Sequence, residues 1–191
     1  SSRIVQRISS PDTDVLVHRW RTEEQAILVG SRTVLNDDPQ LTARLCSGRQ
    51  PLRVVLDRKG ITPPGSMVYS NAAPSLLFTH EVRADFLVEQ VTLPMASDPL
   101  PGMMDELHRR GIRSVLVEGG AELLGHFVRS GLWDEARVIT GEMLCAQGTA
   151  APVLPGSPHR SWLSGNDRID LHINHRPISK LGMIPDPTWP W

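Results

Sequence analysis

The sequence has no excess of charge of either sign and no long hydrophobic run. Its 20 Lys and Arg residues nearly balance 21 Asp and Glu residues, for a formal net charge of −1. It therefore lacks the basic field that attracts nucleic acid, and we expect any anion to be held by a few local groups. No apolar run approaches the ~18 residues of a membrane-spanning helix, and the N-terminus shows no secretory signal pattern. These absences predict a cytoplasmic protein without a nucleic-acid or membrane partner.

Cysteine and the common catalytic motifs are also scarce. Cys46 and Cys145 stand far apart and outside any C-x-x-C spacing, so we expect neither a disulfide framework nor a zinc site. The sequence has no G-x-S-x-G nucleophile elbow, no Walker A loop and no H-E-x-x-H motif. His172 and His175 lie three positions apart in a predicted strand and therefore face opposite sides of it. We predict no metal site.

What the sequence does contain is a regular alternation of short apolar runs with helix-forming segments. Such runs are typical of buried parallel strands. They predict strands over residues 26–30, 52–57, 75–79, 86–93, 114–117 and 135–140. Helices are predicted from Pro11 to about Arg21 with Ser10 as N-cap, over 99–110, and over 121–129. With 191 residues, this order predicts one α/β domain with a mostly parallel sheet and flanking helices.

The C-terminal part of the chain follows a different pattern. Residues 141–158 are rich in Gly and Pro and predict a loop, whereas residues 168–175 alternate cleanly and predict a half-buried, antiparallel strand. We expect the domain to span residues 1–183, followed by a Pro- and Trp-rich tail over 184–191. Trp189 and Trp191 are expected to pack onto the domain or onto a second subunit of a homodimer, because two indoles bury a large apolar area. A disordered end is the alternative.

Residues 114–125 form the most informative stretch. A short β-branched run leads through Glu118 into Gly119 and Gly120, and a helix-forming segment starts at Ala121. Two glycines let a phosphate or ribose approach the backbone closely, and the free N–H groups of the following helix offer an anion site. At the carboxyl end of a parallel strand, Glu118 lies where open α/β sheets bind ligands. A tight turn with a solvated carboxylate is the alternative.

A second informative stretch covers residues 31–44. It begins with a turn of helix and then passes through an Asn-Asp-Asp-Pro sequence at 36–39 that should end the helix in an ordered loop. The carboxylates of Asp37 and Asp38 could cap backbone N–H groups, accept ribose hydroxyls or face water. These residues alone do not choose among the three roles.

Three segments together resemble the reductase domain of riboflavin biosynthesis, the C-terminal half of the bifunctional pyrimidine deaminase/reductase (the RibD family). They read AILVGSRTVLNDDPQLTAR, PLRVVLD and SVLVEGGAELLGHFVRSGLWDEARV. The resemblance runs from about Ile8 to about Pro155, and its T-V-L-x-D-D-P-x-L-T-x-R segment is the most specific part. It implies a dihydrofolate-reductase-like fold. It also implies NADPH-dependent reduction of the ribosyl group of 5-amino-6-(5-phosphoribosylamino)uracil to ribityl.

The resemblance assigns the cofactor half of the site. By position in the motifs, Thr33 and Asp37 are expected to contact the dinucleotide, while Gly119, Gly120 and Ala121 are expected to receive its pyrophosphate. The cofactor is expected to be NADPH.

Arg58 is a further expected cofactor residue. It follows the predicted strand that ends at Asp57, where an adenosine ribose would lie, and an Arg there would accommodate the 2′-phosphate. Solvated loop charges at Arg58 and Lys59 are the alternative.

The resemblance also assigns the substrate half. Arg21, Leu41, Arg44 and Glu118 match family positions that contact the phosphoribosylated pyrimidine. A guanidinium suits a phosphate ester, and a carboxylate suits the donor edges of the pyrimidine or the ribosylamine. Glu118 is the expected catalytic residue, in a substrate-orienting and charge-stabilising role.

The sequence departs from the family pattern in two places. The family opens with a strand resembling K-x-A-x-S-L-D-G, whose Lys and Asp belong to the active site, and the sequence begins without it. It also lacks the H-x-E and P-C-x-x-C zinc ligands of the deaminase half, so we expect no deamination by this chain. Two alternatives stay open: a reductase of the same fold that acts before deamination, and a non-catalytic nucleotide-binding module.

Overall fold

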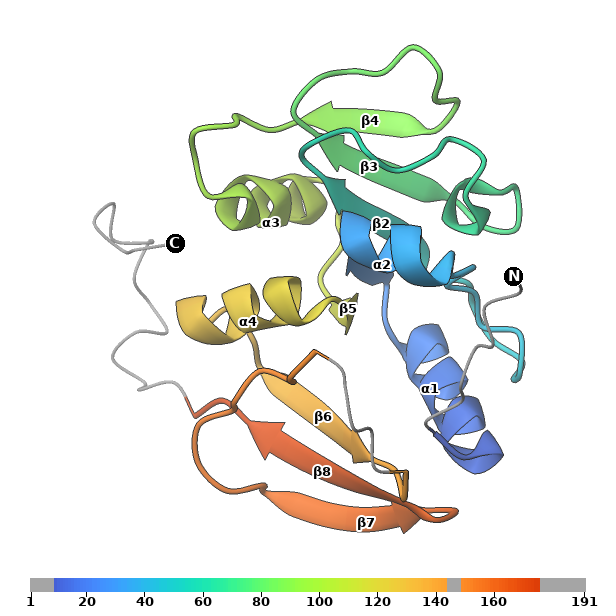
Figure 1. Cartoon of the computed structure of the whole chain (residues 1–191), viewed down its shortest axis with the longest axis vertical. Helices are drawn as coiled ribbons and strands as arrows, with labels where there is room; N and C mark the ends of the chain where they lie inside the picture. Colours follow the sequence, from blue (N-terminus) through green and yellow to red (C-terminus); the bar gives the residue numbers. More distant parts are fainter. Residues whose placement is uncertain (1–8, 144–148, 176–191) are drawn as a thin grey trace.

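The computed structural model describes residues 9–143 and 149–175, which form two β-sheets (Figure 1). The first is parallel, five-stranded and ordered β4-β3-β2-β1-β5; the second is antiparallel, three-stranded and ordered β6-β8-β7. The strands are β1 (Ala26–Gly30), β2 (Leu52–Asp57), β3 (Ser75–Thr79), β4 (Glu89–Thr92), β5 (Val115–Gly119), β6 (Glu135–Thr140), β7 (Arg160–Ser164) and β8 (Asp167–Ile173).

Four α-helices and one 3-10 turn accompany the sheets within these residues: α1 (Pro11–Glu23), α2 (Ser31–Asp37), α3 (Pro99–Arg109), α4 (Ala121–Ser130) and η1 (Met67–Tyr69). The Ser10 side chain accepts a hydrogen bond from the N–H of Thr13 and so caps α1, as its position before Pro11 predicts. Gly131 ends α4 at a φ of +68°, where a side chain would be strained. None of the helices in the described part of the chain has the length and apolarity to cross a bilayer.

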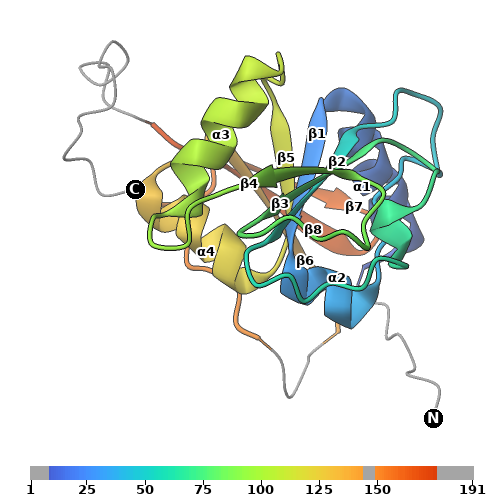
Figure 2. The same ribbon diagram turned by 90° about the horizontal axis from the view of Figure 1, so that it is seen from above.

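The three strands β1, β2 and β3 are buried on both faces of the parallel sheet, which explains why they read as continuous apolar runs. Leu28 and Val54 face a cluster completed by α3 and α4, including Met103 and Phe127. Alternate strand residues such as Val29 face a second cluster that includes residues of α2, η1 and the intervening loops. Figure 2 shows α3 and α4 on one side and α2 on the other. Both faces of these three strands thus exclude water, which leaves the ends of the strands as the place for polar groups.

The predicted strands over 26–30, 52–57 and 75–79 are confirmed as β1, β2 and β3. β4 is shorter than the predicted strand over 86–93, because Phe86 instead packs its ring edge-on against Tyr69, with centroids 4.9 Å apart. β5 starts one residue later than predicted and extends to Gly119. The predicted strand over 135–140 exists as β6, but it pairs antiparallel with β8 and is not part of the parallel sheet. β7 was not predicted. Cys145 and the tail over 184–191, with Trp189 and Trp191, lie outside the described residues.

β2 carries an unusual buried charge. Arg53 has an exposed fraction of 0%, and burial lowers the pKa of its guanidinium. It donates to the carbonyl oxygens of Gln40, Met67, Ser70 and Ala73, and also to the Ser70 hydroxyl. These bonds compensate the cost of desolvating the guanidinium, and they attach two long loops to the sheet.

We expect Arg53→Met to lower the free energy of unfolding by about 2 to 4 kcal/mol, because buried carbonyl groups would lose their donor. Urea unfolding followed by circular dichroism measures this. Arg19→Met is the matched control: Arg19 is 71% exposed and has one helical ion pair with Glu23, so its replacement should change stability by less than about 0.5 kcal/mol. Equal stability of the two variants would contradict this role of Arg53.

Candidate active site

Glu118 lies in a β-bulge at the carboxyl end of β5. The ladder between β1 and β5 pairs Leu28 with Val117 and then Val29 with Gly119, so Glu118 is an extra residue without a partner position on β1. A bulge interrupts the alternation of side chains and changes the direction in which one of them points. Here the extra residue carries a carboxylate that forms an ion pair.

The partner of Glu118 is Arg21, on the last turn of α1. Arg21 donates through Nε to Oε1 at 2.7 Å and through Nη2 to Oε2 at 2.6 Å, a bidentate geometry that fixes both side chains. The two side chains are only 12% and 17% exposed. The remaining nitrogen, Nη1, donates to the carbonyl oxygen of Thr42 at 3.0 Å. Arg21 thus joins α1, the end of β5 and the loop after α2.

The glycine turn follows directly on Glu118 and is packed against α2. A Cβ at Gly119 would lie 2.6 Å from Oγ1 of Thr33, closer than a side chain tolerates. Gly120 has a φ of +80°, which favours glycine, and α4 begins at the next residue, Ala121. Four of the predicted cofactor residues are therefore neighbours. Because α4 starts at this turn, its first N–H groups and the open backbone suit a phosphate group.

The predicted substrate residues Leu41 and Arg44 lie on the loop that Arg21 contacts. Leu41 is buried at a φ of +55°, whereas the side chain of Arg44 is exposed. The backbone N–H of Arg44 donates to Nδ1 of His18 at 2.9 Å. Burial and the charges of Arg21 and Arg44 lower the pKa of His18 to about 4, so the imidazole is neutral near pH 7 and its Nδ1 is an acceptor. His18 was not among the residues expected from the sequence, although its spacing of three from Arg21 places both on one helix face.

Asp37 and Arg58 have less contact with this centre. Asp37 is the last residue of α2, one helical turn beyond Thr33, and it is exposed. Arg58 donates through Nη2 to the carbonyl oxygen of Met95 and is thereby attached to the loop after β4. The structure therefore brings Arg21, Glu118 and the 41–44 loop together, and Thr33 with the glycine turn, while Asp37 and Arg58 lie at other strand and helix ends.

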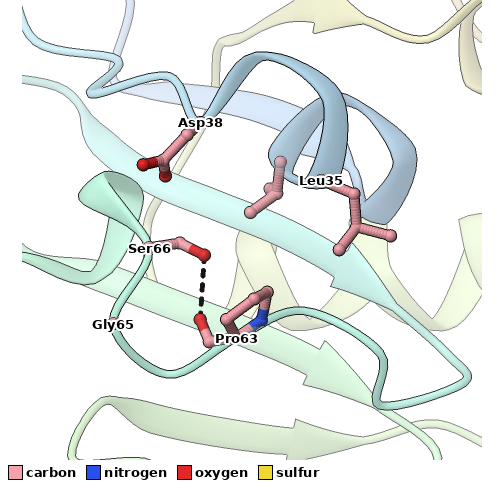
Figure 3. Close-up of a pocket in the computed structure, with 6 residues that line it drawn as sticks. Leu35, Asp38, Pro63, Gly65 and Ser66 are labelled. Carbon is pink, nitrogen blue, oxygen red and sulfur yellow. Dashed lines mark hydrogen bonds between the residues drawn. The ribbon is translucent and has the colours of Figure 1, made fainter. Parts of the chain in front are cut away.

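A shallow depression of about 270 Å³ lies between α2 and the loop after β2 (Figure 3). Its lining comprises Val34, Leu35, Asp38, Pro63, Gly65 and Ser66. The Ser66 hydroxyl donates to the carbonyl of Pro63 at 2.9 Å, and Asp38 accepts from the backbone N–H of Met67 at 2.8 Å. Its polar groups thus serve the loop itself, and none of the predicted site residues lines it. We therefore place the candidate site at the Arg21–Glu118 pair.

The comparisons with known proteins agree with one another and point to riboflavin biosynthesis. The RibD C-terminal domain family model matches residues 2–166. The chain is 37% identical over 154 residues to the riboflavin biosynthesis protein RibD of Chlamydia pneumoniae, which covers 73% of this chain and 41% of that protein. It is 30% identical over 172 residues to the 2,5-diamino-6-ribosylamino-4(3H)-pyrimidinone 5′-phosphate reductase of Archaeoglobus fulgidus. This match covers 81% of this chain and 78% of that protein.

The fold is also similar to solved structures. A diaminohydroxyphosphoribosylaminopyrimidine deaminase/5-amino-6-(5-phosphoribosylamino)uracil reductase from Thermotoga maritima matches with a TM-score of 0.73 and 29% identity. This match covers 85% of this chain and 48% of that one. The chain therefore spans less than half the length of the Chlamydia and Thermotoga relatives. The expected dihydrofolate-reductase-like fold is confirmed.

The contact between Thr33 and the glycine turn predicts a non-additive pair of substitutions. Gly119→Ala should destabilise the protein by about 1 to 3 kcal/mol, because its Cβ would clash with Thr33. Thr33→Ala removes the two nearest atoms, so the double variant should recover part of this loss. Urea unfolding of the two single variants and the double variant measures the coupling. Strictly additive losses would show that Thr33 does not press on the turn.

Proposed function

The chain belongs to the RibD C-terminal domain family, and from this membership we propose that it is an NADPH-dependent reductase of riboflavin biosynthesis. Its substrate would be 5-amino-6-(5-phosphoribosylamino)uracil, and the ribosyl group would be reduced to ribityl. The observation that carries the proposal is the bidentate Arg21–Glu118 pair directly beside the glycine turn. A fixed, partly buried carboxylate next to an open backbone turn is an arrangement in which substrate and dinucleotide meet.

The cofactor half fits a dinucleotide. Gly119 and Gly120 present backbone without side chains, and α4 adds free N–H groups for a pyrophosphate. Thr33 contributes a hydroxyl at the same turn, and Asp37 lies one helical turn further along for a ribose hydroxyl. NADPH would supply the hydride. The work of the chain is to hold the nicotinamide C4 against C1′ of the substrate and to exclude water.

The substrate half fits a phosphoribosylated pyrimidine. The exposed guanidinium of Arg44 suits the phosphate ester, and Leu41 gives the loop a buried anchor. Each carboxylate oxygen of Glu118 accepts one hydrogen bond from Arg21. The remaining lone pairs of these oxygens can accept hydrogen bonds from amino groups of the pyrimidine or from the ribosylamine nitrogen. Because Arg21 fixes the carboxylate before the substrate arrives, little reorganisation is needed as charge shifts during reduction.

A second substrate has its own support. The Archaeoglobus relative, which the chain covers over most of its length, is named for a pyrimidinone that still carries the second amino group. The same carboxylate could accept from that group, so reduction before deamination uses the same residues. A non-catalytic nucleotide-binding module is the third possibility.

One experiment separates these functions. We would titrate the full-length gene product with NADPH by calorimetry and follow NADPH oxidation with each pyrimidine substrate in turn. The proposal expects binding and faster oxidation with the uracil substrate. Faster oxidation with the diamino substrate would assign the earlier step. Binding without oxidation of NADPH by either substrate would identify a binding module.

Glu118→Gln keeps the shape of the side chain and removes its charge. We expect turnover to fall roughly ten- to a hundredfold while the dissociation constant of NADPH changes by less than a few-fold. Steady-state kinetics at saturating NADPH and calorimetry measure the two quantities. Glu106→Gln is the matched control, since Glu106 is a similarly buried carboxylate that accepts from Arg109 and Arg110 on α3. If Glu118→Gln loses NADPH binding and keeps its turnover, the two half-sites are wrongly assigned.

Arg58 should favour the 2′-phosphorylated cofactor. It follows β2, and its contact with Met95 holds it in place at the carboxyl edge of the sheet. Arg58→Ala should therefore reduce the preference for NADPH over NADH by about tenfold or more, because a charge-assisted hydrogen bond is lost. Dissociation constants of both cofactors measure it, with Lys59→Ala as the neighbouring control. An unchanged preference in Arg58→Ala would remove Arg58 from the site.

A further inference from the structure

Residues 40–44 belong to no helix or strand, yet they have a strained backbone. Leu41 has a φ of +55°, in the left-handed region that a residue with a branched side chain rarely adopts. Its side chain is buried in the core that includes Ile27 and Val29. Such a conformation persists only when surrounding contacts over-determine it. The contacts that do so are made by side chains to the backbone of this segment.

Gln50 makes two of these contacts. Its Oε1 accepts from the N–H of Ala43 at 2.8 Å, and its Nε2 donates to the carbonyl oxygen of Ala43 at 3.0 Å. A carboxamide is needed here, because only Asn and Gln offer a donor and an acceptor side by side. Gln50 itself is exposed, so replacing it removes no core packing.

His18 makes the next contact, at the adjacent residue. Its ring is 4% exposed, and the Nδ1 lone pair accepts from the N–H of Arg44. Burial is the largest cause of its lowered pKa, and the positive charges of Arg21 and Arg44 add to it while Asp14 opposes it. The neutral ring is therefore the form that can accept this hydrogen bond.

Arg21 and Arg53 complete the set. Nη1 of Arg21 donates to the carbonyl of Thr42, and Nη1 of Arg53 donates to the carbonyl of Gln40 at 3.3 Å. The same guanidinium of Arg21 pairs with Glu118. The backbone from which the side chain of Arg44 extends is thus fixed relative to the Glu118 carboxylate.

We propose that Gln50 and His18 are positioning residues for substrate binding, which hold the 40–44 backbone so that Arg44 reaches a phosphate ester at a fixed distance from the Arg21–Glu118 pair. The inference rests on the proposed reductase function. Neither residue needs to touch the substrate. Each acts through Arg44, and its loss changes the affinity for the phosphorylated end of the substrate more than the rate of hydride transfer.

Gln50→Ala tests the first residue. The KM for 5-amino-6-(5-phosphoribosylamino)uracil should rise roughly tenfold, with kcat within about twofold, because misplacing a positioned group weakens binding without altering the reacting atoms. The dissociation constant of NADPH should not change.

Gln90→Ala is the matched control. Gln90, on β4, makes the same two hydrogen bonds to the backbone N–H and carbonyl of Arg83, each at 2.8 Å. Arg83 lies on a loop outside the candidate site. This control should leave KM within twofold of the wild type. An unchanged KM in Gln50→Ala, or an equal rise in Gln90→Ala, overturns the role of Gln50.

His18→Leu and His18→Asn test the second residue. A Leu side chain cannot accept the hydrogen bond from the Arg44 N–H, so His18→Leu should raise KM as Gln50→Ala does. In His18→Asn, Oδ1 can accept this bond in place of Nδ1 and should restore most of the affinity. Thr13→Val controls for damage to α1, because it removes the bond from this helix to the carbonyl of Ser164. Equal KM values for Leu and Asn variants overturn the role of His18.

Two measurements separate failure of this inference from failure of the proposed function. Absence of NADPH oxidation by the wild type, with either pyrimidine, refutes the reductase. Amide hydrogen exchange at Ala43 and Arg44 and calorimetric titration with ribose 5-phosphate then still decide the positioning role. Faster exchange and weaker ribose 5-phosphate binding in Gln50→Ala and His18→Leu support it, and wild-type values in both variants overturn it.

Discussion

The pairing of Arg21 with Glu118 is the interaction on which the rest of the site depends. It connects residues 97 positions apart, one on the first helix and one at the end of β5. Removing two charges from water is costly, and their mutual attraction repays this cost only where the geometry is good and further hydrogen bonds are made. The bidentate geometry and the third bond to Thr42 offset part of that cost. The pair therefore defines where α1, the sheet and the 40–44 loop meet.

The parallel sheet has a local irregularity at Glu118. β1 lies between β2 and β5 and is fully buried over its first four residues, so its ladder with β5 is strongly specified by packing. The bulge at Glu118 is the one register shift in that ladder. It leaves Glu118 without a partner on β1 and places Gly119 opposite Val29.

Most of the parallel sheet could be predicted from the sequence, because buried parallel strands leave a local signature of continuous apolar runs. The bounds of β1, β2 and β3 follow from it, and so does the Ser10 cap of α1. The separate pairing of β6 could not be predicted, because alternation identifies a strand without naming its distant partner. β7 was missed since its exposed Leu163 and two serines lack a clear pattern.

The site shows the same limit. Arg21 and Glu118 were each expected from the family resemblance, but their pairing is a property of the fold. The bulge has no sequence mark, because any residue can occupy the extra position. His18 and Gln50 contact backbone atoms, and a backbone acceptor or donor is present at every residue. Sequence alone therefore gives no reason to choose these two side chains over other polar residues.

The contacts also join the two half-sites into one continuous unit. Thr33 packs against Gly119, Gly119 is covalently next to Glu118, and Glu118 is paired with Arg21. Arg21 in turn holds the carbonyl of Thr42, two residues from Arg44. Hydride transfer requires reacting atoms about 3 to 3.5 Å apart in an aligned geometry. In the proposed reductase, the direct contacts from the glycine turn to the 40–44 loop would fix the cofactor-binding and substrate-binding residues relative to one another before either reactant binds.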